Sequence, residues 1–315
     1  MAIYHLTVKT ISKEKSASSL ARYDYIERKE KYSSGLDEVL FSSAGNMPEW
    51  AAKNDREYWV AADKYERQNG RLCKTVEFSL PRELSFEEQK NLVLEFVDKI
   101  SNVNGINLPY SLVVHKGKGT NPHCHVMLSE RINDGLARNA ETWFKRAGKT
   151  PEKGGARKTD ALKSKDWLYW IREEWGRQAN LALEQAGHKE RIDHRTLSEQ
   201  GIEREPTLHQ GPMVTRLEHA GKPTRIGGIN QRIRELNAVI AEQEKDAREE
   251  RFAEMELAIR KGFSGLGLPM KARNMFIDQA IEHLRNSDDV ESDFMEIQKS
   301  ISLAKEKARE LDYGR

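Results

Sequence analysis

The feature that most constrains the fold is a pair of short segments that resemble the two arms of a β-hairpin. Residues 109–115 (PYSLVVH) and 123–129 (HCHVMLS) are rich in strand-forming residues. The run between them, KGKGTNP, contains the Gly, Asn and Pro residues that favour turns. A hairpin makes these segments neighbouring antiparallel strands, and this pairing fixes which of their side chains share a face.

Three histidines lie at the ends of these arms. In a strand, residues i and i+2 point to the same face, so His123 and His125 project together and Cys124 points away. If His115 pairs with His123, all three imidazoles share one face. Three histidines with open coordination positions are typical of a catalytic metal site. A His-x-His pair alone is equally compatible with a surface or packing role, so the third histidine is what favours a metal.

Strand and helix patterns alternate along the first two thirds of the chain. Ser85, followed by Glu87 and Glu88, predicts the start of one of the helices. The predicted strands, in addition to the hairpin, are residues 3–9 and 74–80, and the predicted helices are 16–30, 47–67, 86–101 and 166–186. Strands interleaved with helices predict an α+β fold, a two-layer sandwich with helices on one face of a central antiparallel sheet.

The composition changes beyond about residue 226. A long, highly charged helix is predicted there, with an apolar seam at spacings of three and four formed by Ile229, Ile233, Leu236 and Ile240. The run FSGLGLP (263–269) ends it, and two shorter helices follow, at about 270–285 and 288–311. We therefore predict two domains, residues 1–225 and a C-terminal helical module, residues 226–315. A charged helix of this kind is by default a solvated coiled-coil or bundle element.

Composition narrows the class of protein. Two cysteines are too few for a disulfide framework, and no run approaches the roughly 18–20 apolar residues of a membrane span. The N-terminus lacks the pattern of a signal peptide, so we expect a cytoplasmic protein without membrane insertion.

The formal net charge is only +2 and does not indicate a nucleic-acid partner. Residues 144–165, however, hold eight Lys and Arg against two acidic residues.

This basic run is a candidate DNA-binding segment, because its cations and glycines suit contact with a phosphate backbone. Trp143, Phe144, Trp167 and Trp170 flank it and are candidates for stacking on bases. The alternative is a solvated basic loop with packed aromatic residues. The candidate DNA contacts, inside and outside the run, are Lys145, Arg146, Lys149, Lys153, Arg157, Lys158, Arg131 and Arg195.

The histidine motif and several longer runs resemble the HUH endonucleases and, among them, the MobA/MobL family of plasmid relaxases. The resemblance extends from residue 1 to about residue 212 and does not cover 226–315. The runs that carry it are MAIYHLTVKT, DYIERKEKY, ERQNGRL, NPHCHVMLSERINDG, WFKRAGKTPEKGGARKT and IDHRTLSEQGIER.

The resemblance implies the HUH relaxase fold and metal ligation by His115, His123 and His125. It also implies that Tyr25, within the run DYI, is the nucleophile. The residues alone leave Tyr23, Tyr4 and Tyr32 as rivals, although Tyr23 and Tyr25 lie about 200° apart on a helix, so that only one can face the metal. Asp24 and Glu77 are candidates for orienting a histidine or accepting the tyrosine proton, but each is also compatible with a solvated charge.

The function implied is that of a plasmid mobilisation relaxase. Such an enzyme nicks and rejoins single-stranded DNA at the origin of transfer through a 5′-phosphotyrosine intermediate, with a divalent metal that we expect to be Mn²⁺ or Mg²⁺. The implied partners are origin DNA with an adjacent hairpin, accessory mobilisation proteins and a type IV coupling protein, and the protein would travel with the DNA into the recipient cell. The alternatives are a rolling-circle replication initiator or HUH transposase, a non-cutting origin-binding accessory protein, and a small-molecule metallohydrolase.

Overall fold

The computed structural model describes residues 4–15, 17–30, 38–103, 105–117, 121–287 and 289–313. Contacts divide the chain into two compact units, Met1–His194 and Arg195–Arg315. The predicted domain boundary after residue 225 rests on a change in composition, and it stays a prediction.

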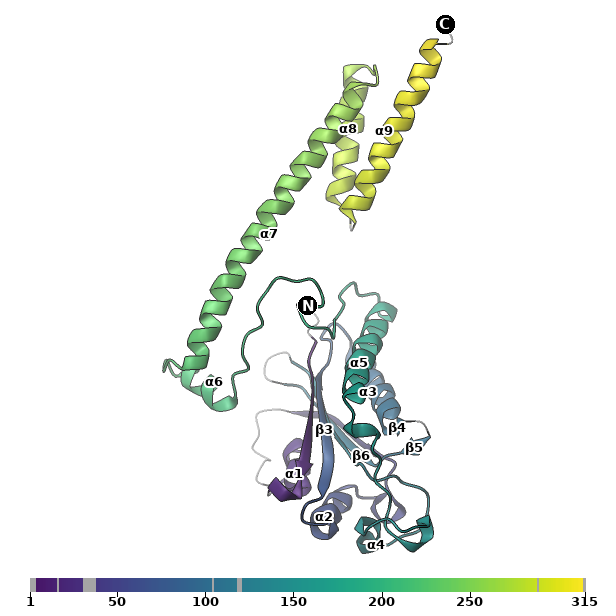
Figure 1. The fold of residues 1–315 in the computed structure, drawn as a ribbon, viewed down its shortest axis with the longest axis vertical. Coiled ribbons are helices and arrows are strands. Elements are labelled where there is room, and N and C mark those ends of the chain that lie inside the picture. Colours follow the sequence, from purple (N-terminus) through teal and green to yellow (C-terminus); the bar gives the residue numbers. More distant parts are fainter. Residues whose placement is uncertain are drawn as a thin grey trace. The chain divides into compact units, whose positions relative to one another are not determined.

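The first unit is built on a five-stranded antiparallel sheet with the order β1-β3-β7-β6-β2. Figure 1 shows this sheet with β3 and β6 labelled. A separate two-stranded ribbon pairs β4 (Asn102–Val103) with β5 (Ile106–Asn107). The predicted hairpin is confirmed, with His115 opposite His123. The strands of the large sheet are β1 (Leu6–Ser12), β2 (Val39–Gly45), β3 (Arg71–Ser79), β6 (Tyr110–His115) and β7 (His123–Leu128).

One face of the sheet carries the larger core. The helices α3 (Phe86–Ser101) and α5 (Lys165–Gln185) pack on it, and the rings of Phe78, Phe96 and Trp175 meet at its centre. Ser85 and Glu88 form the reciprocal capping box at the start of α3. The predicted α+β class with a central antiparallel sheet is confirmed.

The opposite face has a second, shorter cover that the sequence pattern did not indicate. It consists of α1 (Ser19–Ile26), α2 (Arg56–Tyr65) and the short α4 (Ala140–Phe144), which pack on sheet residues that include Val113 and Met127. Two 3-10 turns, Lys13–Lys15 and Glu49–Ala51, precede α1 and α2. The three histidines belong to this same face, because they alternate with residues of the larger core.

The second unit is helical. It contains α6 (Pro212–His219), α7 (Arg225–Ser264), α8 (Met270–Arg285) and α9 (Val290–Tyr313). The long helix, its end at the glycine-containing run and the two following helices are therefore confirmed. The last three helices enclose a small apolar core of Met255, Ile259, Ile277, Ile281, Leu284 and Ile301.

The first half of α7 holds an extended segment of the same unit. The side-chain amide of Asn230 exchanges two hydrogen bonds with the backbone of Leu208, and that of Asn237 does the same with Glu205. The predicted seam residue Leu236 is about half exposed. Within the described part of the chain, no helix is long and apolar enough to cross a membrane.

Candidate metal centre and its surroundings

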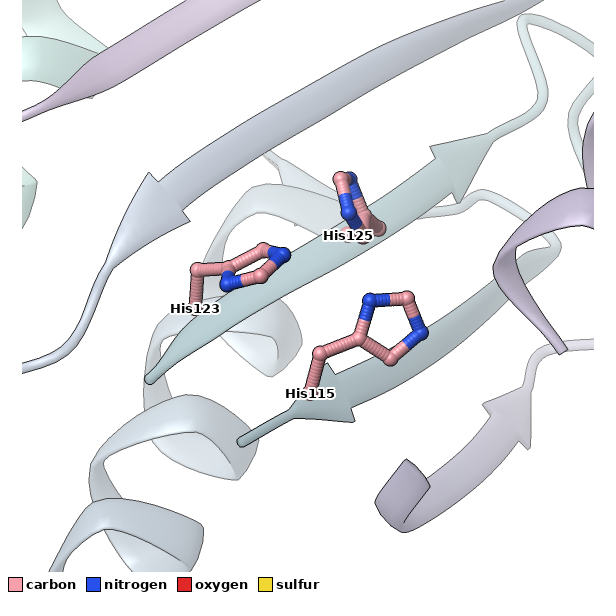
Figure 2. Close-up of side chains that lie close together, drawn as sticks. All are labelled: His115, His123 and His125. Carbon is pink, nitrogen blue, oxygen red and sulfur yellow. The ribbon is translucent and has the colours of Figure 1, made fainter. Parts of the chain in front are cut away.

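Three imidazole rings from the β6–β7 hairpin meet at the end of the sheet (Figure 2). The ring centroids of His115, His123 and His125 lie 4.9–5.2 Å apart. One nitrogen from each ring can be chosen so that all three lie within 4.8 Å of one another. The hairpin register thus brings together the three histidines that the sequence analysis selected.

Hydrogen bonds fix which nitrogen of each ring is available. The Nε2 atom of His115 lies 2.6 Å from the carbonyl oxygen of Ile26, and the Nδ1 atom of His123 lies 3.0 Å from that of Asn121. The Nδ1 atom of His125 lies 3.2 Å from the Oε2 atom of Glu77. Carbonyl and carboxylate oxygens only accept hydrogen bonds, so each of these nitrogens carries the proton and the other keeps its lone pair.

The Nδ1 atom of His115 shows that this arrangement suits a cation. It is buried and has no hydrogen-bond partner among the described residues. A buried nitrogen lone pair without a donor is costly, and a metal ion would satisfy it. Neutral imidazoles are ligands for divalent ions such as Mn²⁺ and Zn²⁺, so the three residues fit the expected group.

Burial keeps two of the rings neutral. It lowers the pKa of His115 to about 4, with the hydrogen bond to Ile26 acting in the opposite direction. It also lowers the pKa of His125, against the opposing effect of Glu77. A neutral imidazole is the form that binds a metal, so both rings are ready for ligation at neutral pH.

Glu77 lies on β3 directly opposite His125. Its hydrogen bond to His125 lowers its pKa to about 2, although burial acts in the opposite direction. The guanidinium of Arg22 adds to this effect, with its Nη2 atom 3.7 Å from the Oε2 atom of Glu77. The Glu77 carboxylate is therefore ionised at neutral pH and is an acceptor for the His125 N–H.

Helix α1 is fixed at both ends. Ser18 caps its first turn, and the Asp63 carboxylate accepts hydrogen bonds from Ser18 and Ser19. Its last residue, Ile26, binds His115 through its carbonyl group. Tyr25 precedes this contact, with 37% of its surface exposed, and the guanidinium carbons of Arg22 and Arg28 lie 5.1 and 4.8 Å from its ring centroid.

The rival tyrosines have different surroundings. Tyr23 is 2% exposed and donates a 2.9 Å hydrogen bond to Asp55, and burial raises its pKa. The hydroxyl of Tyr4 donates to the carbonyl oxygen of Arg172 at 3.4 Å, and burial raises its pKa too. Tyr32 lies outside the described residues. Among the described candidates in α1, Tyr25 is thus the exposed tyrosine.

Asp24 and Glu77 are not placed alike. The carboxylate of Asp24 accepts hydrogen bonds of 2.9 and 3.1 Å from the guanidinium of Arg56 on α2. Of these two carboxylates, that of Glu77 contacts a histidine, whereas that of Asp24 links α1 to α2.

Arg131 requires a correction, because it is buried instead of exposed to DNA. It is 5% exposed, and its guanidinium donates to the Glu66 carboxylate and to the carbonyl oxygens of Trp143, Phe144, Lys145 and Ala156. These bonds involve all three of its nitrogens, so none is left for a phosphate. Lys158 is also turned inward, with its Nζ atom 3.0 Å from Glu66 and 2.5 Å from the carbonyl oxygen of Arg71.

The basic run is a tightly folded loop held by Arg131. A Cβ atom at Gly154 would lie 2.0 Å from the nitrogen of Gly148, so the backbone folds closely on itself there. Three of the four flanking aromatic residues, Trp143, Phe144 and Trp167, are buried and cannot stack on bases, whereas Trp170 is partly buried. Of the remaining candidates, Lys145 pairs with Glu141, and Arg195 lies in the second unit. Of the candidate DNA contacts in the loop, the exposed ones are Lys145, Arg146, Lys149, Lys153 and Arg157.

Sequence reasoning missed Arg22, whose Nη2 atom lies 3.4 Å from the Nδ1 atom of His125. The available signal was its position one helical turn before Tyr25 and Ile26, which places these residues on neighbouring parts of one helix face. No pattern in the sequence indicates that this face of the helix is directed toward the histidines.

Comparison with known proteins identifies similar proteins that are named for mobilization or relaxation. Mobilization protein A of Escherichia coli is 54% identical over 241 residues, which cover 76% of this chain and 34% of the relative. The 43 kDa relaxation protein of Salmonella typhimurium is 40% identical over 216 residues, which cover 65% of this chain and 57% of the relative. This chain thus spans about a third of the first and just over half of the second. The model of the MobA/MobL family matches residues 8–220, more than half of the chain, and the protein therefore belongs to the MobA/MobL family.

Proposed function

We propose that this protein is a relaxase that nicks and rejoins single-stranded DNA at an origin of transfer, with Tyr25 as nucleophile. The observation that carries the proposal is the contact between His115 and Ile26, which joins the candidate metal site to the residue after Tyr25. The names of its relatives, a mobilization protein and a relaxation protein, support the same role.

The histidines would hold the metal through the Nδ1 atom of His115 and the Nε2 atoms of His123 and His125. A divalent ion held there supplies a Lewis acid for the scissile phosphate, and we expect Mn²⁺ or Mg²⁺. Three neutral histidine ligands add no negative charge of their own to the metal site. Glu77 fixes the orientation and tautomer of His125. Its low pKa makes it a weak base, which favours this orienting role over acceptance of the tyrosine proton.

Tyr25 would form the bond between its Oη atom and phosphorus as the bond from phosphorus to the 3′ oxygen breaks. Its proton leaves to water, and the departing 3′ oxygen takes up a proton to become a 3′-OH. The 5′-phosphotyrosine keeps the energy of the phosphodiester, so a 3′-OH can reverse the step without ATP. Asp24, through Arg56, would hold α1 in place while this occurs.

The exposed cations of the basic loop would contact DNA away from the cut. Lys158 anchors this loop at Arg71, which precedes Glu77 on β3 by six residues. At about 3.4 Å per residue, the loop anchor lies about 20 Å from the histidines. This corresponds to about six nucleotides along one strand of duplex DNA, so the loop suits a hairpin beside the nick and not the scissile phosphate.

The second unit would bind partner proteins. Its exposed apolar residues on α7, including Leu236 and Val239, are candidates for docking to accessory mobilisation proteins or to a type IV coupling protein. We place the activity in the bacterial cytoplasm, before transfer of the protein with the DNA.

A nicking assay tests the proposal. The full chain is incubated with Mn²⁺ and labelled single-stranded origin DNA, and the products are separated in SDS. We expect an SDS-resistant covalent adduct that a chelator abolishes and added metal restores. Absence of the adduct with the wild-type protein would indicate a non-cutting accessory protein, and an adduct insensitive to chelator would exclude the metal.

A further inference from the structure

Arg22 is a cation that contacts both the candidate nucleophile and the histidine cluster. Its Nη2 atom is 3.4 Å from the Nδ1 atom of His125 and 3.7 Å from the Oε2 atom of Glu77. Its guanidinium carbon is 5.1 Å from the ring centroid of Tyr25. Its side chain is 26% exposed, so a ligand can reach it.

These contacts do not saturate the guanidinium. The Nδ1 atom of His125 already donates to Glu77, and an N–H group cannot accept a hydrogen bond from Arg22. The separation from Glu77 fits an ion pair but is too long for a hydrogen bond. Both of these contacts involve Nη2, whereas a guanidinium presents five N–H donors on three nitrogens.

A phosphate group suits this position. A phosphoryl group that reacts with Tyr25 near the histidines must approach both groups, and the guanidinium of Arg22 lies close to both. Guanidinium groups bind two phosphate oxygens through paired N–H donors. If a phosphate bound here, charge-assisted hydrogen bonds from Arg22 to its oxygens would replace the weak contact between Arg22 and His125.

Charge balance points in the same direction. In phosphoryl transfer the transition state carries more negative charge than the phosphodiester, spread over its equatorial oxygens. Glu77 cancels one of the two positive charges of a divalent ion held by neutral histidines. Arg22 restores the second positive charge at the point where negative charge develops, which is the arrangement that stabilises a transition state.

On this basis we propose that Arg22 is a catalytic residue that binds the non-bridging oxygens of the scissile phosphate, beside the metal. This rests on the proposed nicking function. The requirement is for a planar donor of two hydrogen bonds and not simply for positive charge, so Lys at this position should replace it only in part.

Single-turnover kinetics test the contact with the full chain, saturating Mn²⁺ and origin DNA. We expect Arg22→Gln to lower the rate of adduct formation about 10²–10³-fold, Arg22→Lys to recover part of the rate, and Mn²⁺ affinity to stay within about threefold in both. Arg28→Gln is the matched control, because Arg28 also lies over the Tyr25 ring, with its guanidinium 4.8 Å away. It should lose less than about tenfold.

A binding measurement separates contact from a structural effect. In a Tyr25→Phe background without metal, DNA with a neutral methylphosphonate at the mapped cut site is compared with ordinary DNA by fluorescence anisotropy. Neutralising the phosphate should weaken binding about tenfold when Arg22 is present and hardly at all in Arg22→Gln. Equal losses in the two, or equal rate losses for Arg22→Gln and Arg28→Gln, would overturn the inference alone. Absence of a wild-type adduct would overturn the proposed function and the inference with it.

Discussion

The Nε2 atom of His115 donates a hydrogen bond of 2.6 Å to the carbonyl oxygen of Ile26. One ring thus faces a candidate metal with its Nδ1 atom and holds the last turn of α1 with its Nε2 atom. Since Tyr25 is the residue before Ile26, the position of the proposed nucleophile depends on the same side chain that would bind the metal.

His115→Ala should therefore have two effects. It should weaken Mn²⁺ binding more than about a hundredfold, because loss of a direct ligand exceeds the 10–100-fold effect of an outer partner. It should also speed amide hydrogen exchange at Glu27 and Lys29, which close the end of α1, by about fivefold, the equivalent of one lost hydrogen bond.

His123→Ala is the matched control for that experiment. It removes a ligand of the same type, whose hydrogen bond goes to Asn121 and not to α1. Calorimetry should show a similar loss of Mn²⁺ affinity, whereas exchange at Glu27 and Lys29 in the metal-free protein should stay as in the wild type. Equal acceleration in both variants would show that His115 does not hold α1.

Glu77→Gln should reduce Mn²⁺ affinity by about 10–100-fold without unfolding the protein. The amide can present an N–H instead of an acceptor to His125, so the ring loses the partner that fixes its tautomer. Glu77→Asp keeps the charge and should recover part of the affinity. Titration with Mn²⁺ measures both variants, and wild-type affinity in Glu77→Gln would show that this contact does not orient the ligand.

Arg131→Ala should lower the free energy of unfolding by about 3–5 kcal/mol, because it leaves the buried Glu66 carboxylate without its main partner. Arg157→Ala changes an exposed cation of the same region and should alter stability by less than about 0.5 kcal/mol. The second variant should instead weaken DNA binding and reduce its salt dependence by about one unit of slope. Urea unfolding and binding at several salt concentrations distinguish these roles, and similar stability losses in both would contradict them.

Glu174 should make stability depend on pH. Its hydrogen bond to Arg177 is the largest of the effects that lower its pKa, together with those to Lys99 and Gln178, and the pKa falls to about 2. A pKa that is lower in the folded state stabilises the protein above the ordinary value of 4.5, and this stabilisation is lost as the pH falls toward 2.

Glu174→Gln should thus lower the free energy of unfolding by about 1–2 kcal/mol at pH 7. The expected loss is small because Lys99 and Arg177 are partly exposed, so that solvent screens their charges. The difference from wild type should shrink between pH 4.5 and pH 3. Glu173→Gln, at an exposed neighbouring position, should match wild type at each pH. Urea unfolding at several pH values checks this, and a difference that grows on acidification would show that the sign is wrong.

The parts of the fold that could be predicted are those encoded by short-range sequence patterns. The turn-forming sequence between His115 and His123 made the pairing of β6 with β7 predictable, and with it the convergence of the three histidines. The capping residues Ser85 and Glu88 located the start of α3. β2 was not predicted, because VLFSSAG has little apolar alternation and forms an edge strand that gains its stability from pairing with β6.

Long-range contacts set the rest of the site. Arg131 and Arg146 are both plausible phosphate ligands in the sequence, but only the folded chain places Glu66 beside Arg131 and turns it inward. In the same way, the approach of Arg22 to His125 joins residues 103 positions apart. No local pattern encodes which face of α1 meets the sheet.

The central claim is that Tyr25 is the nucleophile, and mass spectrometry of the covalent adduct tests it most directly. Trypsin releases the peptide YDYIER, residues 23–28, which contains both Tyr23 and Tyr25, and fragmentation locates the nucleotide within it. We predict that the nucleotide is attached to Tyr25, that Tyr25→Phe forms no adduct and that Tyr23→Phe still forms one. A nucleotide on Tyr23 or on a tyrosine elsewhere in the chain would contradict the account.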